Sequence, residues 1–178
     1  MFSCAFLQSL KLEMFRMNTH IHTIDPVYDS DSKILILGSF PSVASRHSGF
    51  YYGHHNNRFW KVISEVLGVK MPIETKDKKE LLLSNHIALW DVIARCEIVG
   101  SSDSSIRNAV PNNICEIIER SHVKAIFTNG NVADSLYKKY LADACGIEAT
   151  KLPSTSPANA AYSIERLTEC WKVIKDFL

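Results

Sequence analysis

The stretch KILILGSF, residues 33–40, decides the fold that this sequence predicts. Its run of apolar residues ends at Gly-Ser, a pattern typical of a strand buried on both faces of a parallel sheet. VKAIFTNG at 123–130 repeats the pattern, IALWDVI at 87–93 is a third candidate strand, and GIEATKLPS at 146–154 carries a short last one. Buried strands therefore recur at intervals along the chain.

Segments with helical spacing separate these strands. In NRFWKVISEVLG the apolar residues share one helical face, with Asn57 at the expected N-cap and Gly68 as the stop signal. Further helices are expected at 76–84, 114–121, 131–144 and 163–178. Strands that alternate with helices predict an α/β fold, a three-layer α/β/α sandwich with a central four-stranded parallel sheet. Ligands bind beyond the carboxyl ends of such strands, so we expect the site in the loops after residues 37, 92, 128 and 152.

The composition is typical of a globular protein with one domain. With 178 residues, of which 46% are hydrophobic and 22% charged, the chain can bury a core without disulfide bonds or bound metals. No apolar run reaches the length of a membrane span, and nothing demands more than a monomer. Five cysteines stand at positions 4, 96, 115, 145 and 170, without C-x-x-C spacing. We expect reduced thiols in an intracellular protein, cytoplasmic in a prokaryote; a metal site assembled from distant parts of the chain is the alternative.

Residues 1–24 are expected to form a leader ahead of a single domain at 25–178. Lys11, Glu13 and Arg16 interrupt its apolar beginning, and no cleavage site of the A-x-A kind follows, so it lacks the pattern of a secretion signal. A start codon placed too early is the alternative to a functional leader. In either case we expect loose order there, as at most termini.

Two windows of the sequence lack acidic residues, although the net charge is only +1. The first runs from Lys33 to Ser64 and the second from Ala149 to Ile164. A chain this close to neutral does not coat nucleic acid through bulk charge. The windows therefore indicate local contacts with anions, unless the gaps in acidic residues arise by chance.

FYYGHHNNRFW at 50–60 combines five aromatic residues with two histidines and two asparagines. Buried polar groups without partners cost a few kcal/mol each, so this composition favours a surface that receives something flat over a core segment. GSFPS at 38–42 follows a strand and offers backbone N–H groups and hydroxyls, while PSTSPANAA at 153–161 is stiffened by two prolines. Each of these two loops, taken alone, is also compatible with an ordinary connection.

Four blocks of sequence together carry a resemblance to a known family. They are GSFPS, GFYYGHHNNRFWKVI, ALWDVIARCE with GSSDSSIRN, and LPSTSPANAAYS. In this order they are similar to the DNA-deoxyinosine (hypoxanthine-DNA) glycosylase family of the uracil-DNA glycosylase superfamily, over residues 30–178. The resemblance implies the same sandwich fold and a monofunctional repair enzyme that hydrolyses the N-glycosidic bond of deoxyinosine in DNA. It implies no cofactor, no metal and no membrane.

The resemblance also implies which residue positions the attacking water. The wider superfamily carries an acidic or amide residue at the third position of its first motif, where this chain has Phe40. The role therefore passes to the amide that precedes Arg-Phe-Trp, which is Asn57 here, while His55 stands where the family pattern has Pro. An Asn side chain cannot act as an ordinary base, but it can orient water toward an oxocarbenium-like sugar.

The remaining site residues follow from the same motifs. Tyr52 and Phe50 are expected to stack on a flipped purine, with Phe40 as a further wall; plain core roles for Phe50 and Phe40 are the alternative. In GSFPS, which begins with Gly38 and Ser39, a backbone N–H is expected to contact O6 of the base. The residues expected to contact DNA are Ser42, Arg46, His54, Ser154, Ser156, Pro157, Ala158 and Asn159.

Three side chains receive other interpretations. Asp91 is expected to brace loops, and Trp60 and Trp171 to belong to the core. Two alternatives to hypoxanthine release stay open: a glycosylase for uracil or xanthine in mismatches, and a nucleic-acid-binding module without catalysis. The sequence also leaves the preference for the opposite base open.

Overall fold

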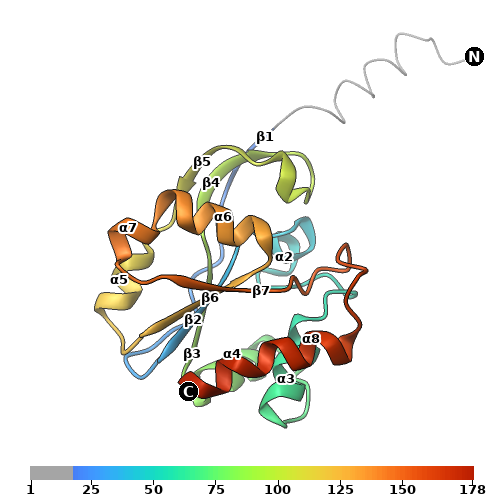
Figure 1. Ribbon diagram of the computed structural model, residues 1–178. Coiled ribbons are helices and arrows are strands. Elements are labelled where there is room, and N and C mark those ends of the chain that lie inside the picture. The colour runs from blue at the N-terminus through green and yellow to red at the C-terminus, as the bar shows by residue number, and fades with distance from the viewer. Residues whose placement is uncertain (1–17) are drawn as a thin grey trace, which may run out of the picture.

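A computed structural model describes residues 18–178, and a four-stranded parallel sheet lies at its centre (Figure 1). The strands are β2 (Ile34–Gly38), β3 (Ile87–Asp91), β6 (Ala125–Asn129) and β7 (Ala149–Leu152). Their order across the sheet is β3-β2-β6-β7, which places the strand of the opening motif between two neighbours. All five residues of β2 are buried, as expected of a strand covered on both faces.

Helices cover both faces of this sheet. One layer contains α3 (Phe59–Leu67), α4 (Thr75–Ser84) and α8 (Ile164–Trp171), which continues as the 3-10 helix η2 (Lys172–Phe177). The other layer contains α5 (Ile114–Glu119), α6 (Asn131–Tyr140) and α7 (Ala142–Cys145).

Successive residues of β2 enter different cores. Ile34 and Ile36 pack with the α3 and α8 layer, while Leu35 and Leu37 pack with the opposite layer. This alternation, which the pleat of a strand imposes, joins two apolar cores through one sheet. The predicted three-layer α/β/α sandwich is confirmed.

A second, antiparallel sheet lies at one end of the molecule and was not predicted. It consists of β1 (Asn18–Ile21), β4 (Ile93–Ile98) and β5 (Arg107–Pro111), in the order β1-β4-β5. The sequence predicts a loop over 100–113, because the residues of β5 form no apolar run, and in the structure this strand is largely exposed. The 3-10 helix η1 (Asp103–Ser105) also lies in this stretch. Residues 18–24 of the expected leader thus belong to the fold, and 1–17 lie outside the described residues.

The helix boundaries follow the expected stop signals with local differences. Gly68 ends α3 in the left-handed conformation, with φ 70°, as its position predicts. The helix expected at 131–144 divides at Leu141 into α6 and α7. A short helix that was not predicted, α2 (Val43–Ser48), follows β2, and its N-cap Ser42 accepts a hydrogen bond from the Ser45 N–H.

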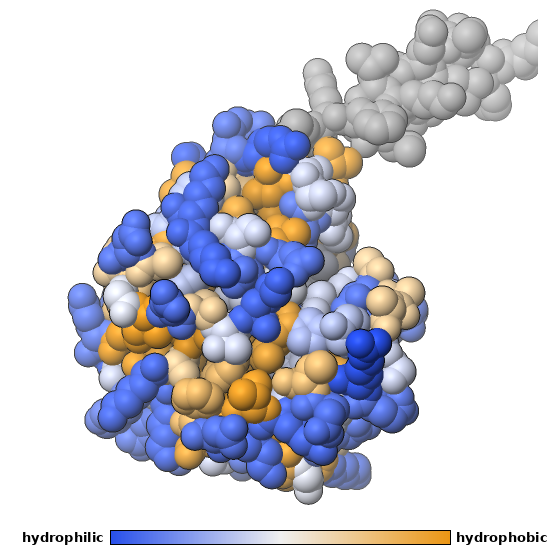
Figure 2. All heavy atoms as spheres, in the orientation of Figure 1, coloured by the Kyte–Doolittle hydropathy of each residue, from blue (hydrophilic) through white to orange (hydrophobic). Residues whose placement is uncertain are grey.

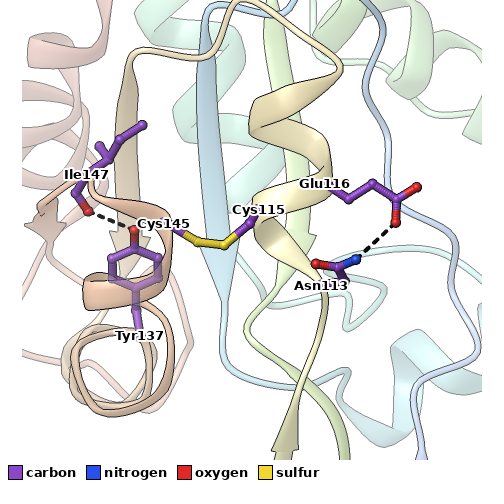
Figure 3. Close-up of a disulfide and its surroundings, with 6 residues drawn as sticks. All are labelled: Asn113, Cys115, Glu116, Tyr137, Cys145 and Ile147. Atoms are coloured by element: carbon purple, nitrogen blue, oxygen red, sulfur yellow. Dashed lines mark hydrogen bonds between the residues drawn. A yellow bond between two sulfur atoms is a disulfide. The ribbon is translucent and has the colours of Figure 1, made fainter.

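A disulfide joins two helices of one layer (Figure 3). Cys115 in α5 pairs with Cys145 in α7, with a Cα–Cα distance of 5.2 Å. Beside it, the Tyr137 hydroxyl donates to the Ile147 carbonyl at 2.7 Å. The expectation of reduced cysteines is wrong for this pair, because separation along the chain does not show which residues the topology brings together. Cys96 and Cys170 are free thiols, and Cys4 lies outside the described residues.

Hydrophilic side chains cover most of the face drawn in Figure 2, with apolar residues in separate patches between them. Three exposed apolar side chains, Val69, Met71 and Ile73, belong to the segment between α3 and α4. Most large apolar side chains lie in the two cores instead. None of the helices within residues 18–178 is long and apolar enough to cross a membrane.

Loss of the disulfide is expected to lower the free energy of unfolding by about 3–4 kcal/mol. The cross-link closes a loop with a sequence separation of 30, which restricts the unfolded chain. For a protein of this size that corresponds to a fall in Tm of about 10 °C. Thermal melts should show this fall in Tm for Cys145→Ser and for the parent protein in reductant. Cys170→Ser should melt like the parent, because the Cys170 thiol that it removes is free and exposed. Equal melting of the parent and Cys145→Ser would contradict the prediction.

Candidate active site

A pocket of about 550 Å³ opens at the carboxyl ends of the parallel strands, the edge that the sequence predicts. It unites residues from the loops after β2, β3, β6 and β7. The predicted site residues that line it are Gly38, Ser39, Phe40, Ser42, Tyr52, His54, Asn57, Ser154, Ser156 and Pro157. Segments about one hundred residues apart in the sequence therefore meet at one cavity.

An adjoining pocket of about 530 Å³ lies over the ends of β6 and β7. Ala158 and Asn159 line this second pocket, together with Lys151 and Tyr162. Ser154 and Ser156 border both pockets. Ala158 and Asn159, which are expected to contact DNA, therefore lie beside the first pocket and not within it.

Two predicted site residues line neither pocket. Phe50 is buried in the α3 core, where its ring stacks on Trp60 at 5.8 Å. Arg46 donates to the Pro41 carbonyl at 2.7 Å and lies over the Phe40 ring, 5.7 Å from its centroid. Phe50 is therefore a core residue, and Arg46 supports the loop after β2 from outside the pocket.

Asn57 is held by hydrogen bonds from two different segments. Its Oδ1 accepts from the Phe59 N–H at 3.0 Å and from the Thr155 hydroxyl at 3.1 Å. The expected capping role is thus present, although α3 begins one residue later than an N-cap at Asn57 would give. The contact with Thr155, a residue with no exposed surface, joins the loop after β2 to the loop after β7.

Arg58 organises the loop after β7, residues 153–162, which we call the clamp loop. Its guanidinium donates to the carbonyls of Ser156 (2.6 Å), Asn159 (3.0 Å) and Tyr162. From the other side, the Trp171 indole N–H donates to the Pro153 carbonyl at 3.0 Å. The positive charge of Arg58 therefore shapes this loop and is not free to meet a ligand, a role that the sequence analysis did not identify.

Tyr52 forms a rigid aromatic wall of the pocket. Its ring stacks on Phe59 at 3.9 Å, and Phe59 in turn meets Trp171 edge to face at 5.8 Å. The backbone of Tyr52 is in the left-handed region, with φ 53°, which costs conformational energy in a residue other than glycine. Burial, and then the nearby Asp91 charge, raises the pKa of Tyr52 far above its usual range. The phenol is therefore neutral in the free protein.

Asp91 places a carboxylate in this pocket, which the sequence analysis interpreted only as a brace. His22 lies 2.9 Å from Oδ2, and the Ile24 N–H donates to the other ring nitrogen, which places the imidazole hydrogen on the atom facing Asp91. Oδ1 lies against Gly38, where an added Cβ would stand only 2.1 Å from it. Gly38 is therefore required for the approach of the carboxylate, and Asp91 has both a bracing and a pocket-lining role.

Asp103 supplies a second carboxyl group to the pocket. Burial raises the pKa of Asp103; the Ser39 hydroxyl opposes this shift, and the Asp91 charge adds to it. Neither carboxyl group comes from the two acid-free windows, which the sequence analysis interpreted as local contacts with anions. The pocket thus combines two acidic groups with a rim that contains His47 and His54.

Sequence reasoning missed several of these residues for a common reason. Asp103, Asn129 and Thr155 received no role from the sequence, although Asp103 and Thr155 lie within the quoted motif blocks, because only the fold places them beside the pocket. Within residues 18–178, no group of three or more His, Cys, Asp or Glu side chains is arranged to hold a metal ion.

Replacement of Asp103 by Asn is expected to stabilise the protein near neutral pH. Because the carboxyl pKa is higher in the folded than in the unfolded protein, ionisation of Asp103 lowers the free energy of unfolding. This loss of stability is complete above the folded pKa and disappears as the pH falls toward the unfolded value of about 4. Thermal melts of Asp103→Asn and parent should therefore differ at pH 7 and converge in acid. Asp31→Asn, which removes an exposed carboxylate, is the matched control. A variant less stable than the parent at pH 7 would contradict the assignment.

Comparisons with known proteins agree with this architecture. The hypoxanthine DNA glycosylase of Methanosarcina acetivorans is 35% identical over 150 residues, covering 83% of this chain and 93% of that protein. That of Methanosarcina barkeri is 33% identical over 136 residues, covering 75% and 85%. A solution NMR structure from Methanosarcina acetivorans, of a protein assigned as a uracil DNA glycosylase, superposes with a TM-score of 0.75 at 32% identity, over 88% of this chain and 96% of that one.

The model of the uracil DNA glycosylase superfamily matches residues 26–178, which include every loop of the pocket. The chain therefore belongs to the uracil DNA glycosylase superfamily.

Proposed function

We propose that this protein is a hypoxanthine DNA glycosylase, which hydrolyses the N-glycosidic bond of deoxyinosine in DNA and leaves an abasic site. One observation carries the proposal: Asn57, the Tyr52 wall and the clamp loop border a single pocket at the carboxyl edge of the sheet. The names of the two relatives, which are similar over most of the chain, support hypoxanthine as the base. A flipped purine nucleoside is of a size that a pocket of about 550 Å³ can receive.

The walls of the pocket suit a flat base. Tyr52 is backed by Phe59, so a base that stacks on its free side meets a surface that is already ordered. Phe40 lines the same cavity and lies edge-on to His22, at 6.0 Å. A base–aromatic stack contributes about 1–3 kcal/mol, which offsets the few kcal/mol that base flipping costs.

Asp91 offers a means to reject adenine. Hypoxanthine carries a hydrogen on N1, whereas adenine presents a lone pair there, which a carboxylate would repel. A free Asp91 oxygen can accept from N1–H, while a backbone N–H of the GSFPS loop remains our candidate donor to O6. Uracil and xanthine also carry a ring N–H between carbonyl groups, so this contact separates damaged bases from adenine more sharply than from one another.

The proposed reaction needs alignment more than strong base catalysis. The C1′–N9 bond breaks first, its electron pair leaves with the base, and O6 of hypoxanthine shares the negative charge. A water positioned by Asn57 then forms the new C1′–O bond and loses a proton, while DNA phosphates stabilise the cationic sugar.

The rim of the pocket is the proposed DNA-binding surface. Ser154 and Ser156 lie on the clamp loop at the border of both pockets, where their hydroxyls and nearby backbone N–H groups can bind phosphates. Ala158 and Asn159 are the proposed wedge that fills the gap left by the flipped nucleotide. Ser42 and His54 border the opposite side.

A duplex oligonucleotide with one deoxyinosine tests the assignment directly. We expect an abasic site at that position, detected by alkaline strand cleavage. Release from a deoxyuridine duplex alone would replace hypoxanthine by uracil as the substrate. Tight binding without release of either base would indicate a binding module instead.

Asn57→Ala is expected to lower the single-turnover rate about 100-fold or more, since loss of alignment at a reacting centre has effects of this size. Asn56→Ala is the matched control, because Asn56 is an exposed neighbouring amide that does not line the pocket. Equal rates for the Asn57 variant and the parent would remove Asn57 from the mechanism.

Gly38→Ala is expected to abolish most activity in a folded protein. The new methyl group would stand 2.1 Å from Asp91 Oδ1 and 3.3 Å from the Tyr52 hydroxyl, and must displace the carboxylate. A displacement of about 1 Å in such a site costs about 100-fold in rate. Circular dichroism would verify the fold. Parental activity would show that the position of Asp91 is irrelevant to the reaction.

A further inference from the structure

The orientation of the Asn57 amide extends the proposed function, on which this inference rests. We propose that Thr155 and Asn129 lock Asn57 with its NH₂ group toward the pocket, so that Asn57 serves the reaction as a hydrogen-bond donor. Thr155 is then a positioning residue, which acts through Asn57 and does not touch the substrate.

Backbone N–H groups can only donate, so they fix the directions of the hydrogen bonds around Asn57. The Thr155 N–H donates to Asn129 at 2.9 Å, so the acceptor there must be the amide oxygen. The Asn129 amide nitrogen is consequently the atom that lies 2.9 Å from the Thr155 hydroxyl oxygen, to which it donates. Both contacts fix the orientation of Asn129.

The Thr155 hydroxyl transmits this direction to Asn57. Because its oxygen already accepts from Asn129, its own hydrogen is available for the other neighbour, Asn57 Oδ1, at 3.1 Å. A second backbone donor, the Phe59 N–H, reaches the same Asn57 oxygen at 3.0 Å. Two independent donors therefore identify this atom as the oxygen.

The amide nitrogen of Asn57 remains for the ligand. No described residue accepts a hydrogen bond from it, and Asn57 lines the pocket. A rotated amide would lose both bonds to its oxygen and set N–H groups against two donors. Thr155 has no exposed surface, so water cannot easily replace its contact. The pocket thus receives two N–H donors from Asn57 and no carbonyl oxygen.

This direction defines what Asn57 can do to the reacting water. A water that accepts from the amide N–H keeps its second lone pair for C1′, and its hydrogens point to other acceptors. Asn57 therefore fixes the place of the nucleophile and takes no proton from it; the proton released after attack passes to solvent or a DNA phosphate. Such a role suits a reaction in which the base has already departed.

Asn57→Asp separates the donor role from an acceptor role. One carboxyl oxygen can still accept from Phe59 and Thr155, and the other replaces the NH₂ group. That second oxygen donates only when the carboxyl is protonated. We therefore expect the single-turnover rate of Asn57→Asp, divided by that of the parent, to rise at least about tenfold as the pH falls from 8 to 4.5 through the ordinary range of a carboxyl group. A ratio that is flat, or highest at pH 8, overturns the inference.

Division by the parent rate is necessary because the site contains other titratable and charged groups. Those that line the pocket are Asp91, Asp103, His47, His54, Tyr51 and Tyr52, with His22 behind Asp91 and the charge of Arg58 beside Asn57. They are common to both proteins, so the ratio isolates the changed group.

Two substitutions of Thr155 test its positioning role. Thr155→Val keeps the shape of the side chain and removes the hydroxyl. Single-turnover base release should slow about tenfold, because this corresponds to the loss of about one hydrogen bond, and DNA affinity should not change. Thr155→Ser retains the hydroxyl and should restore the rate to within about twofold of the parent. Equal rates for the two variants overturn this role. The Asn57→Asp profile does not depend on whether the Val variant folds.

Parallel duplexes with deoxyinosine and deoxyuridine keep this inference distinct from the proposed function. If the parent releases only uracil, hypoxanthine is the wrong substrate, yet the pH ratio on deoxyuridine still decides the direction of Asn57. If the parent releases hypoxanthine and the ratio favours high pH, the function stands and the donor role is wrong. Release of neither base contradicts both.

Discussion

The hydrogen bonds that join Asn129, Thr155 and Asn57 are the constraint on which the site depends. Asn129 ends β6, Thr155 belongs to the clamp loop, and Asn57 lies just before α3. The donor and acceptor atoms of their hydrogen bonds are 2.9–3.1 Å apart. Parallel strands bring three loops to one edge, but they do not dictate how the loops orient their side chains. The buried Thr155 supplies that orientation, because its hydroxyl has one donor and one acceptor partner. Arg58 strengthens the arrangement by binding the carbonyls of the same loop.

Close packing fixes the remainder of the pocket. Gly38 leaves room for Asp91, and Gly130, with φ 98°, leaves room for Ser154, whose Cβ would be 2.8 Å from an added methyl group. Tyr52 has an unfavourable backbone conformation, and its ring stacks on Phe59. Strain of this kind persists only where the surroundings determine it strongly, as they do beside two packed cores. The pocket is therefore closely packed before any ligand arrives, and under the proposed function such order lowers the cost of aligning a reactive nucleoside.

The fold was largely predictable because its determinants are local. The runs that became β2 and β6 are continuous and apolar, and Gly68 stops α3 where the pattern says it should. The second sheet was not predictable, since β5 is exposed and owes its pairing to β4. The Cys115–Cys145 disulfide depends likewise on the proximity of α5 and α7. Most of the residues that the motifs predicted for the site line the pocket, whereas Phe50 lies in a core, because composition cannot tell which ring of FYY faces the pocket. Asp103 and Thr155 were missed since their roles depend on partners distant in sequence.

The most direct test of the account is a crystal structure with duplex DNA that contains a 2′-fluorinated deoxyinosine, whose glycosidic bond resists cleavage. The account predicts an everted hypoxanthine against Tyr52, with its N1 edge toward Asp91 and a water between the Asn57 amide nitrogen and C1′. The clamp loop should contact the flanking phosphates. A base that stays stacked in the duplex, or one that occupies another part of the surface, would contradict the account.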